Sequence, residues 1–346
     1  MRRPEEWPSS TESGLQVCLF TYGPGFPMRK ARAFKLSINF AAGAALVNTP
    51  SRILLTNLRY VVFVSFRGGS VRTAEWIQGI FAVLLAIAAW CVPLPGARRR
   101  RITVFALIVV AAVAFAWATQ FWLPQSASNA FRNWLPVGLM LIPYWQTGQF
   151  FQRPNLKIQN WLMNLDRRWL TYTAQRIGTA HTRLGLVFEI AYVFCYPFVP
   201  LGLGVLYVAG LERRVDEYWF VVLTATYICY AITPFFPAMP PRDVAKYEAG
   251  ASRAAGDRAN RGQVFNRWLQ EWGSIHAISF PSAHVASTLA VSMVLTRHLH
   301  VVGICFLVVA GCIAVAAVAG RYHYTLDVVL GGVVAVGVFT ATYRWF

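Results

Sequence analysis

The chain has 346 residues and a formal net charge of +18, with 56% hydrophobic and only 13% charged residues. Soluble domains carry roughly 25% charged residues and do not gather apolar residues into long uninterrupted blocks, so this composition argues against a soluble protein. The basic residues cluster between the apolar blocks, as they do beside anionic lipid headgroups, and they form no nucleic-acid-binding motif, which excludes a nucleic-acid-binding protein.

The N-terminal region is predicted to lie outside the main bundle. Residues 1–36 mix Pro, Gly, Ser and charge without helical periodicity, which predicts a disordered leader. The leader lacks the basic-then-apolar order of a secretory signal, and Met28, followed by basic residues, is an alternative start to Met1. Residues 37–75 are moderately apolar but broken by proline and arginine, so we expect them to lie along the membrane surface. Together with about two membrane spans that follow, this segment forms a predicted N-terminal membrane-associated region, residues 37–125.

Six apolar blocks are long enough to cross a bilayer as helices, for which about 20 residues are needed. These blocks are residues 76–95, 102–124, 184–210, 218–236, 299–320 and 325–343. Two weaker candidates are 131–151, which contains prolines and glutamines, and the short block 283–296. We therefore expect an all-α fold, a polytopic membrane helix bundle with a six-helix catalytic core in residues 126–346 and one or two extra N-terminal spans.

Two polar stretches interrupt these blocks. In residues 155–172 the apolar side chains follow a helical stripe, so an amphipathic helix at the membrane interface is expected. Residues 237–282 form the longest interruption in the C-terminal half, and long irregular segments in compact proteins are usually functional or disordered. The six cysteines show no metal-ligand or redox spacing, so we expect neither a disulfide framework nor a zinc site.

The ionisable residues beside the C-terminal blocks fall into three short segments, 236–243, 279–284 and 320–327. In the third segment His323 and Asp327 stand four residues apart, so on a helix they share one face and can hydrogen-bond. A carboxylate on one ring nitrogen sets the tautomer and raises the basicity of the other nitrogen, which suits a nucleophile toward phosphorus or a base toward water. A helix-capping Asp beside an interfacial His is the structural alternative.

The other two segments hold candidate proton donors and phosphate ligands. Pro281 suits a first helical turn, and Ser279 or Ser282 supplies a cap. Free N–H groups at such a helix start bind phosphate oxygens, and His284 is placed to give a proton to a departing oxygen. Arg242, after two prolines, can bind phosphate oxygens bidentately.

The predicted topology brings the segments together. Arg321, two residues before His323, is a further phosphate ligand or, like Arg242, a topology anchor. Two predicted helices, 283–296 and 299–320, separate the second segment from the third, so both loops return to the same face of the membrane. The candidate residues of all three segments can therefore converge.

At these residues the chain resembles the type 2 phosphatidic acid phosphatase superfamily, whose signatures are Lys-x6-Arg-Pro, Pro-Ser-Gly-His and Ser-Arg-x5-His-x3-Asp. Pro281-Ser-Ala-His284 matches the second signature with Ala for Gly, and His323-x3-Asp327 matches the end of the third. His323-Tyr-Thr-Leu-Asp327-Val and Pro-Pro-Arg242 look most like the sphingolipid branch, meaning the inositol phosphorylceramide and sphingomyelin synthases.

The chain departs from the family pattern at three positions. Phe235 stands where the first signature has Lys, and Ala316 and Ala317 stand where the third has Ser-Arg. The phosphate site therefore has fewer basic residues, unless Arg321 or Lys246 substitutes. These departures leave the substrate open among a sphingolipid, a diacylglycerol phosphate and a polyprenyl phosphate.

The resemblance, which covers residues 130–346, implies a lipid phosphatase or phosphotransferase with a phosphohistidine intermediate and no metal or cofactor. It implies that His323 attacks phosphorus, that Asp327 orients it, and that His284 protonates the leaving alcohol and then activates the acceptor. It implies four side chains for the phosphoryl oxygens: Arg242, Arg321, Ser282 and Lys246. Water as acceptor makes a phosphatase, and a lipid or polyol hydroxyl makes a transferase.

Two further features leave alternatives open. Glu189, near Tyr192 inside an apolar block, either lines the substrate cavity or bonds to a neighbouring tyrosine or helix. A transporter or lipid-binding protein without hydrolytic activity is the alternative function, although no inverted repeat is found, and a serine protease would leave His323 unexplained.

The orientation in the membrane is predicted differently by two arguments. The arginine-rich loops 96–101 and 152–183 are predicted on the same side of the membrane as the three site segments. The positive-inside rule makes that side cytoplasmic. The family resemblance implies an extracytoplasmic site, with the plasma membrane as the expected location.

Overall fold

The computed structural model describes residues 16–17, 64–65, 71–169, 183–248, 275 and 277–346, with the backbone alone for the four strand residues and for 169, 183–186 and 245–248. The chain divides into two compact units, Met1–Val71 and Arg72–Phe346. In the first unit the described strands β1 (Gln16–Val17) and β2 (Val64–Ser65) pair antiparallel. Of the predicted leader and surface segment, the structure otherwise describes only residues 71–75, and residues 73–75 belong to the helix Thr73–Cys91 instead of the surface segment. The rest of both segments stays a prediction.

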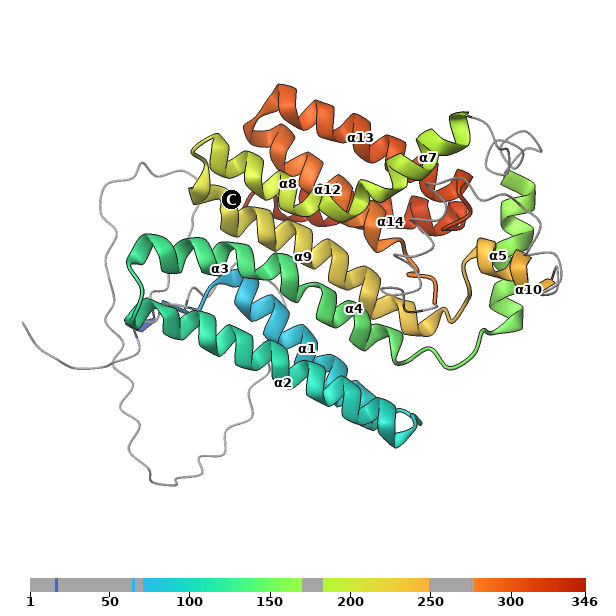
Figure 1. Ribbon diagram of the computed structural model, residues 1–346, viewed down its shortest axis with the longest axis horizontal. Helices are drawn as coiled ribbons and strands as arrows, with labels where there is room; N and C mark the ends of the chain where they lie inside the picture. Colours follow the sequence, from blue (N-terminus) through green and yellow to red (C-terminus); the bar gives the residue numbers. More distant parts are fainter. Residues whose placement is uncertain (1–15, 18–63, 66–70, 170–182, 249–274, 276) are drawn as a thin grey trace, which may run out of the picture. The chain divides into compact units, whose positions relative to one another are not determined.

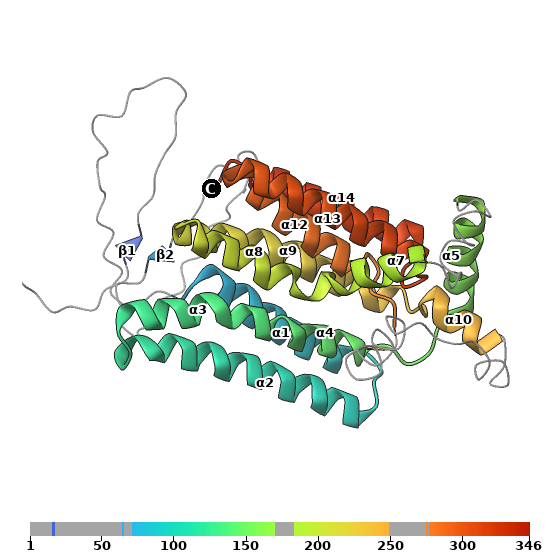
Figure 2. The same cartoon turned by 45° about the horizontal axis from the view of Figure 1, so that its top comes forward.

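The second unit is a bundle of α-helices (Figure 1, Figure 2). Its N-terminal helices are α1 (Thr73–Cys91), α2 (Gly96–Ala118), α3 (Gln125–Leu139), α4 (Leu141–Gly148) and α5 (Leu156–Trp169). Its C-terminal helices are α7 (Arg183–Val193), α8 (Cys195–Val208), α9 (Val215–Ile232), α10 (Pro241–Glu248), α12 (Ala283–His298), α13 (His300–Ala319) and α14 (Thr325–Thr342). Short 3₁₀ turns η1 (Thr119–Phe121), η2 (Glu212–Arg214) and η3 (Thr233–Phe235) flank α2 and α9.

Five helical stretches among the described residues are long and apolar enough to cross a membrane: Thr73–Cys91, Gly96–Phe121, Glu212–Phe235, His300–Ala319 and Thr325–Thr342. A sixth is the bent pair Val187–Val193 and Cys195–Val208, if it counts as one span. These are the six blocks singled out in the sequence, and the all-α polytopic bundle is confirmed. The weaker block 131–151 is divided between α3 and α4.

The block 184–210 was predicted as one span, but the helix bends by 54° between its two parts. Pro197 and Pro200 lie in the first turns of α8. Proline has no N–H to donate to the carbonyl four residues earlier, and its ring crowds that carbonyl, so a continuous straight helix is disfavoured here.

The short helix α12 lies at the centre of the bundle, packed against α8, α9, α13 and α14. Ten of its sixteen residues are buried, and three of these ten carry hydroxyls. Thr288 Oγ1 donates to His284 O at 2.8 Å, and Ser292 Oγ donates to Thr288 O at 2.7 Å, so these polar groups are satisfied within the helix. The surrounding helices bury α12, which explains why this helix needs neither the length nor the hydropathy of the outer ones.

Candidate active site

The structure places His323 and Asp327 in contact at the start of α14. His323 Nδ1 and Asp327 Oδ2 are 3.0 Å apart, and the residues are only 4% and 0% exposed. Asp327 is the third residue of α14, so its carboxylate lies in the first turn, at the positive end of the helix dipole. Because Nδ1 faces the carboxylate, Nε2 is the ring nitrogen left free for chemistry.

This contact does not arise from two residues on one helical face, as the spacing suggested. The helix begins only at Thr325, with Tyr324 as the N-cap in extended backbone (φ −76°, ψ 153°). His323 therefore precedes the helix. An acidic side chain at the third helical position reaches back toward the residues before the cap, as in a capping box, and here Asp327 meets the imidazole.

The second segment turns into α12 through two serine caps. Ser282 is the N-cap, and its Oγ accepts a hydrogen bond from Val285 N at 3.4 Å. Ser279 Oγ accepts another from Ala283 N at 3.2 Å. Both predicted capping serines are used, but Pro281 precedes the cap instead of lying in the first turn.

His284 lies in the first turn of α12 and faces the ring of His323. Its ring centroid is 5.9 Å from that of His323, with the two planes at 82°. Tyr192 and Tyr196 contact it edge-on, with centroids at 5.9 Å and 5.7 Å. The predicted convergence of the second and third segments is thus present in the structure.

A close approach of two helices holds these segments together. Ser282 N donates to the main-chain oxygen of Asp327 at 2.9 Å. One turn further along α14, a Cβ atom added to Gly331 would lie 2.5 Å from Ser282 O, closer than real Cβ atoms pack. Glycine at this position lets the start of α12 lie directly on α14.

Arg242 joins the first segment to the third. Its backbone N donates to Arg321 O at 3.0 Å, and its guanidinium carbon lies 4.9 Å from the centroid of the Tyr322 ring. Its Nη1 is buried and has no hydrogen-bond partner within the described ranges. This arginine is therefore held by backbone and ring contacts and retains a donor for an anion.

Beneath Arg242, Tyr322 links the loop to the bent helix. Its ring stacks on Tyr192 with centroids 3.8 Å apart and an interplanar angle of 3°. Its hydroxyl donates to Glu189 Oε2, and burial raises the pKa of Tyr322, so the hydroxyl stays protonated and can donate. Glu189 is buried and bonds to a tyrosine of another segment, which is the second of the two alternatives raised for it.

The two alanines that replace the family's Ser-Arg have a packing role. Ala316 and Ala317 are buried in one cluster with Tyr192 and Tyr322. Small side chains here make room for the tyrosine stack, and the carbonyl of Ala317 accepts the N–H of Tyr322 at 2.9 Å. The tyrosine stack thus packs where the third signature would place its serine and arginine.

The remaining predicted phosphate ligands are less closely placed. Arg321 is exposed and has a left-handed backbone (φ 60°), which is uncommon outside glycine. Lys246 lies in α10, but its side chain is outside the described part of the chain. Phe235, at the position of the missing lysine, is 76% exposed.

Helix α5 contacts the segments around Met239 and Tyr324, and the sequence analysis missed these contacts. Gln159 donates to the Tyr324 hydroxyl, and its Oε1 accepts from Met239 N at 2.8 Å. Asp166 Oδ1 accepts from Thr325 N at 2.9 Å and so caps α14. Burial raises the pKa of Asp166 above its ordinary value, while the bonds from Thr325 oppose the shift.

A signal for these contacts was present in the sequence. Positions 159, 162 and 166 follow the three- and four-residue spacing of a single helix face, and Leu162 between the two polar residues is 1% exposed. The helix itself was predicted, and Figure 2 shows it lying across the end of the bundle. Polar residues flanking a buried leucine indicate a face docked on protein, which the hydrophobic stripe alone did not reveal.

The described residues contain no group of three or more His, Cys, Asp and Glu side chains placed to hold a metal ion. The chemical groups gathered here are two imidazoles, a buried carboxylate and an arginine, beside two helix starts. Together they form a largely buried site with the chemistry to bind an anionic group.

A family model described as the PAP2 superfamily matches residues 160–341, which is more than half of the chain. The chain belongs to the PAP2 superfamily. Membership supports a phosphatase-type activity on a lipid phosphate, and with the membrane-spanning helices it makes this an integral membrane protein. Comparison with curated proteins and with solved structures found no match.

Proposed function

We propose that this protein is a lipid phosphatase or lipid headgroup phosphotransferase that forms a phosphohistidine on His323. The observation that carries the proposal is the buried 3.0 Å contact of His323 Nδ1 with Asp327, beside the ring of His284. An imidazole oriented by a carboxylate, with a second imidazole facing it, supplies a nucleophile and a separate proton donor.

In the first step His323 Nε2 attacks phosphorus. A nitrogen–phosphorus bond forms while the bond from phosphorus to the ester oxygen breaks. Burial and the nearby His323 lower the pKa of His284 to about 3 in the free protein, so His284 takes up a proton with the anionic substrate and gives it to the departing alkoxide. Asp327 stabilises the positive charge that develops on His323, because its carboxylate is already in place and needs no reorganisation.

In the second step His284, now neutral, accepts a proton from the acceptor hydroxyl. The acceptor oxygen attacks phosphorus, the nitrogen–phosphorus bond breaks, and both imidazoles return to their starting protonation states. Water as acceptor releases inorganic phosphate, and a lipid or polyol hydroxyl gives a new phosphodiester.

The phosphoryl oxygens are proposed to contact Arg242, Arg321, Ser282 and Lys246. Support is strongest for Arg242, whose buried Nη1 has no partner among the described residues. Ser282 contributes through its position at the start of α12, where the positive end of the helix dipole favours an anion. Arg321, which is exposed, would have to turn toward the site when substrate binds, and Lys246 is proposed from the sequence alone.

Within the superfamily we assign the protein to the branch that resembles inositol phosphorylceramide synthases, on the strength of Pro-Pro-Arg242 and of the residues from His323 to Asp327. This assignment favours a transferase acting on a sphingolipid or a related phospholipid. No metal is needed in the proposed steps, because the charges are carried by arginine and imidazole.

The site is proposed to face the extracytoplasmic side of the plasma membrane. Two arginines that argued for the opposite orientation have structural contacts: Arg98 donates to Gln149 O at 3.1 Å, and Arg99 donates to Val92 O at 3.0 Å. These contacts give Arg98 and Arg99 a role in packing the ends of α1 and α4, and the proposed orientation follows the family resemblance.

The proposal is tested by measuring phosphate release from a panel of lipid phosphates by purified protein in the presence of a chelator. His323→Ala should abolish release, whereas His300→Ala, an exposed histidine at the start of α13, should not. Headgroup transfer to a ceramide or diacylglycerol acceptor is measured in parallel. Absence of both release and transfer in the wild-type protein would refute the proposal.

A further inference from the structure

A second basic site lies apart from the catalytic pair, between α2 and α4. It is a pocket of about 440 Å³, which falls within the usual range for small-ligand sites. Nine residues line it: Arg98, Arg101, Phe105, Trp145, Gly148, Gln149, Phe151, Gln152 and Ile275. The lining contains two arginines, two amides and three aromatic rings, and none of the nine is acidic.

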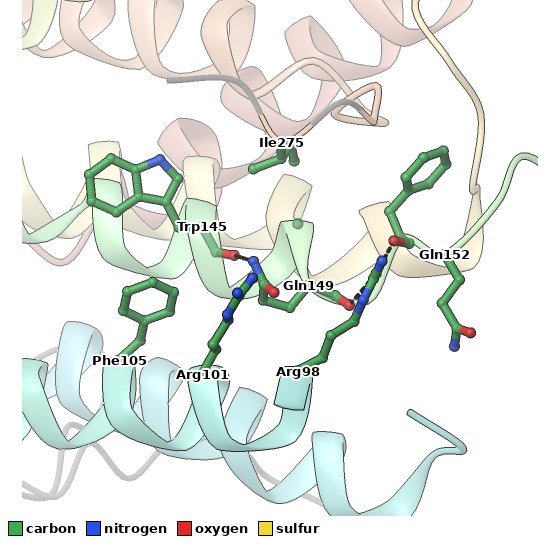
Figure 3. Close-up of a pocket in the computed structure, with 9 residues that line it drawn as sticks. Arg98, Arg101, Phe105, Trp145, Gln149, Gln152 and Ile275 are labelled. Carbon is green, nitrogen blue, oxygen red and sulfur yellow. Dashed lines mark hydrogen bonds between the residues drawn. The ribbon is translucent and has the colours of Figure 1, made fainter. Parts of the chain in front are cut away.

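The two arginines differ in what they contact. Arg98 is fixed, since its Nη1 donates to the carbonyls of Gln149 and Phe151 at the end of α4. Arg101, one turn further along α2, is exposed, and no hydrogen bond or ion pair occupies it within the described part of the chain. Figure 3 shows both side chains extending from α2 toward α4. Arg101 therefore offers a positive charge without a described protein partner, whereas Arg98 is held by the two carbonyls.

The pocket has a basic end near the expected headgroup level and an aromatic end nearer the apolar interior, so its position favours a ligand with both a polar and an apolar part. Arg98 and Arg101 lie in the first turns of the candidate membrane span Gly96–Phe121, where lipid headgroups are expected. Phe105 lies a further turn along the same helix, toward the apolar interior. Trp145, opposite Phe105 in Figure 3, is 37% exposed, as is typical of an aromatic ring at the membrane interface.

We propose that this pocket binds the phosphate-bearing headgroup of an anionic membrane lipid, with Arg101 as the principal ligand of the phosphate. The amides of Gln149 and Gln152 donate to Trp145 O and Pro93 O, and each keeps a second N–H for the headgroup. The acyl chains follow Phe105 along α2. Arg98 adds its charge while it holds the end of α4.

The site borders the segment that leads to the catalytic histidine. A Cβ atom added to Gly148 would lie 2.4 Å from the Ile275 side chain, so Ile275 rests directly on α4. Ile275 N also donates to the Tyr144 hydroxyl at 3.3 Å. A lipid in the pocket thus touches the start of the stretch that continues to Ser282 and His284, although it lies outside the site proposed for catalysis.

The test is native mass spectrometry of the full chain, released from detergent after titration with phosphatidylglycerol or with phosphatidylcholine. The wild-type protein should retain phosphatidylglycerol preferentially. Arg101→Gln should weaken this retention about tenfold, because a charge-assisted contact is lost, and Arg101→Lys should fall between the two. Arg100→Gln is the matched control, since it removes the same charge from an exposed residue of the same helical turn that does not line the pocket.

Binding, not turnover, is measured, so the result does not depend on the proposed catalytic activity. Equal loss of phosphatidylglycerol in Arg101→Gln and Arg100→Gln would show a general surface-charge effect and overturn the proposal. Equal retention of phosphatidylcholine would overturn it as well. Binding of millimolar inorganic phosphate with the same dependence on Arg101, without retention of the lipid, would assign the pocket to a free anion and overturn the lipid source.

Discussion

Replacement of Asp327 by Asn isolates the orienting role of the buried carboxylate. Asparagine keeps the size of the side chain, and the main-chain bond from Ser282 N to residue 327 is unaffected. The amide can donate a proton to His323 Nδ1, which stabilises the tautomer whose Nε2 carries hydrogen and has no lone pair for phosphorus. The folded structure should therefore persist while the nucleophile is lost.

The size of the effect follows from two contributions. Loss of a hydrogen bond to a charged group costs about 1.5–3 kcal/mol, a factor of roughly ten to one hundred and fifty in rate. The corresponding change in Ser-His-Asp enzymes, which combines this loss with the wrong tautomer, lowers kcat by about 10⁴ and gives the upper bound. We expect turnover to fall by about 10³, between these bounds.

The assay is turnover of a lipid phosphate together with rapid-quench trapping of the ³²P-labelled enzyme, since both steps of the mechanism use His323. Asp216→Asn, an exposed carboxylate at the start of α9, is the matched control and should retain full activity. Thermal unfolding of both variants verifies that the fold is intact. A folded Asp327→Asn protein that keeps activity within about threefold of the wild type would refute the role of the carboxylate, because even the hydrogen bond alone predicts more.

Three further predictions concern groups around this pair. His284→Asn should slow phosphoenzyme formation from alkyl phosphates by about 10²–10⁴ but slow it much less from an aryl phosphate, because phenolate leaves without a proton; equal losses in this first step would contradict the acid role. Tyr322→Phe keeps the ring under Arg242 but removes the bond to Glu189, so we expect KM for the lipid phosphate to rise several-fold with little change in kcat, and Tyr322→Ala should be clearly worse. Asp166→Ala should cost about 1 kcal/mol of stability in thermal unfolding, because it uncaps α14. The raised pKa of Asp166 means that the folded state favours its protonated form. The pH-dependent part of its contribution to the free energy of unfolding is therefore fully present below the ordinary pKa of 3.8 and declines as pH rises through the shifted pKa. Asp166→Asn should remove that pH dependence.

Much of this architecture follows from local sequence. The spans were predictable because a helix that crosses a bilayer needs a long run of uncharged residues, and these residues are consecutive in the sequence. The capping serines of α12 were predictable for a similar reason, since a cap depends on the residues next to it. The convergence of His284 with His323 followed from counting helices between the two loops.

Tertiary structure decided what depends on residues distant in the chain. The spacing of His323 and Asp327 suggested a shared helical face, but the helix starts two residues after His323, where the Asp166 carboxylate accepts the N–H of Thr325 and caps it. The partner of Glu189 is Tyr322, more than one hundred residues away, and Gln159 meets Tyr324 at a similar separation. Side-chain contacts of this kind depend on how helices pack, and packing is set by shape complementarity over the whole bundle. Sequence therefore determined the spans and the chemical groups, and only the packed bundle determined which groups face one another.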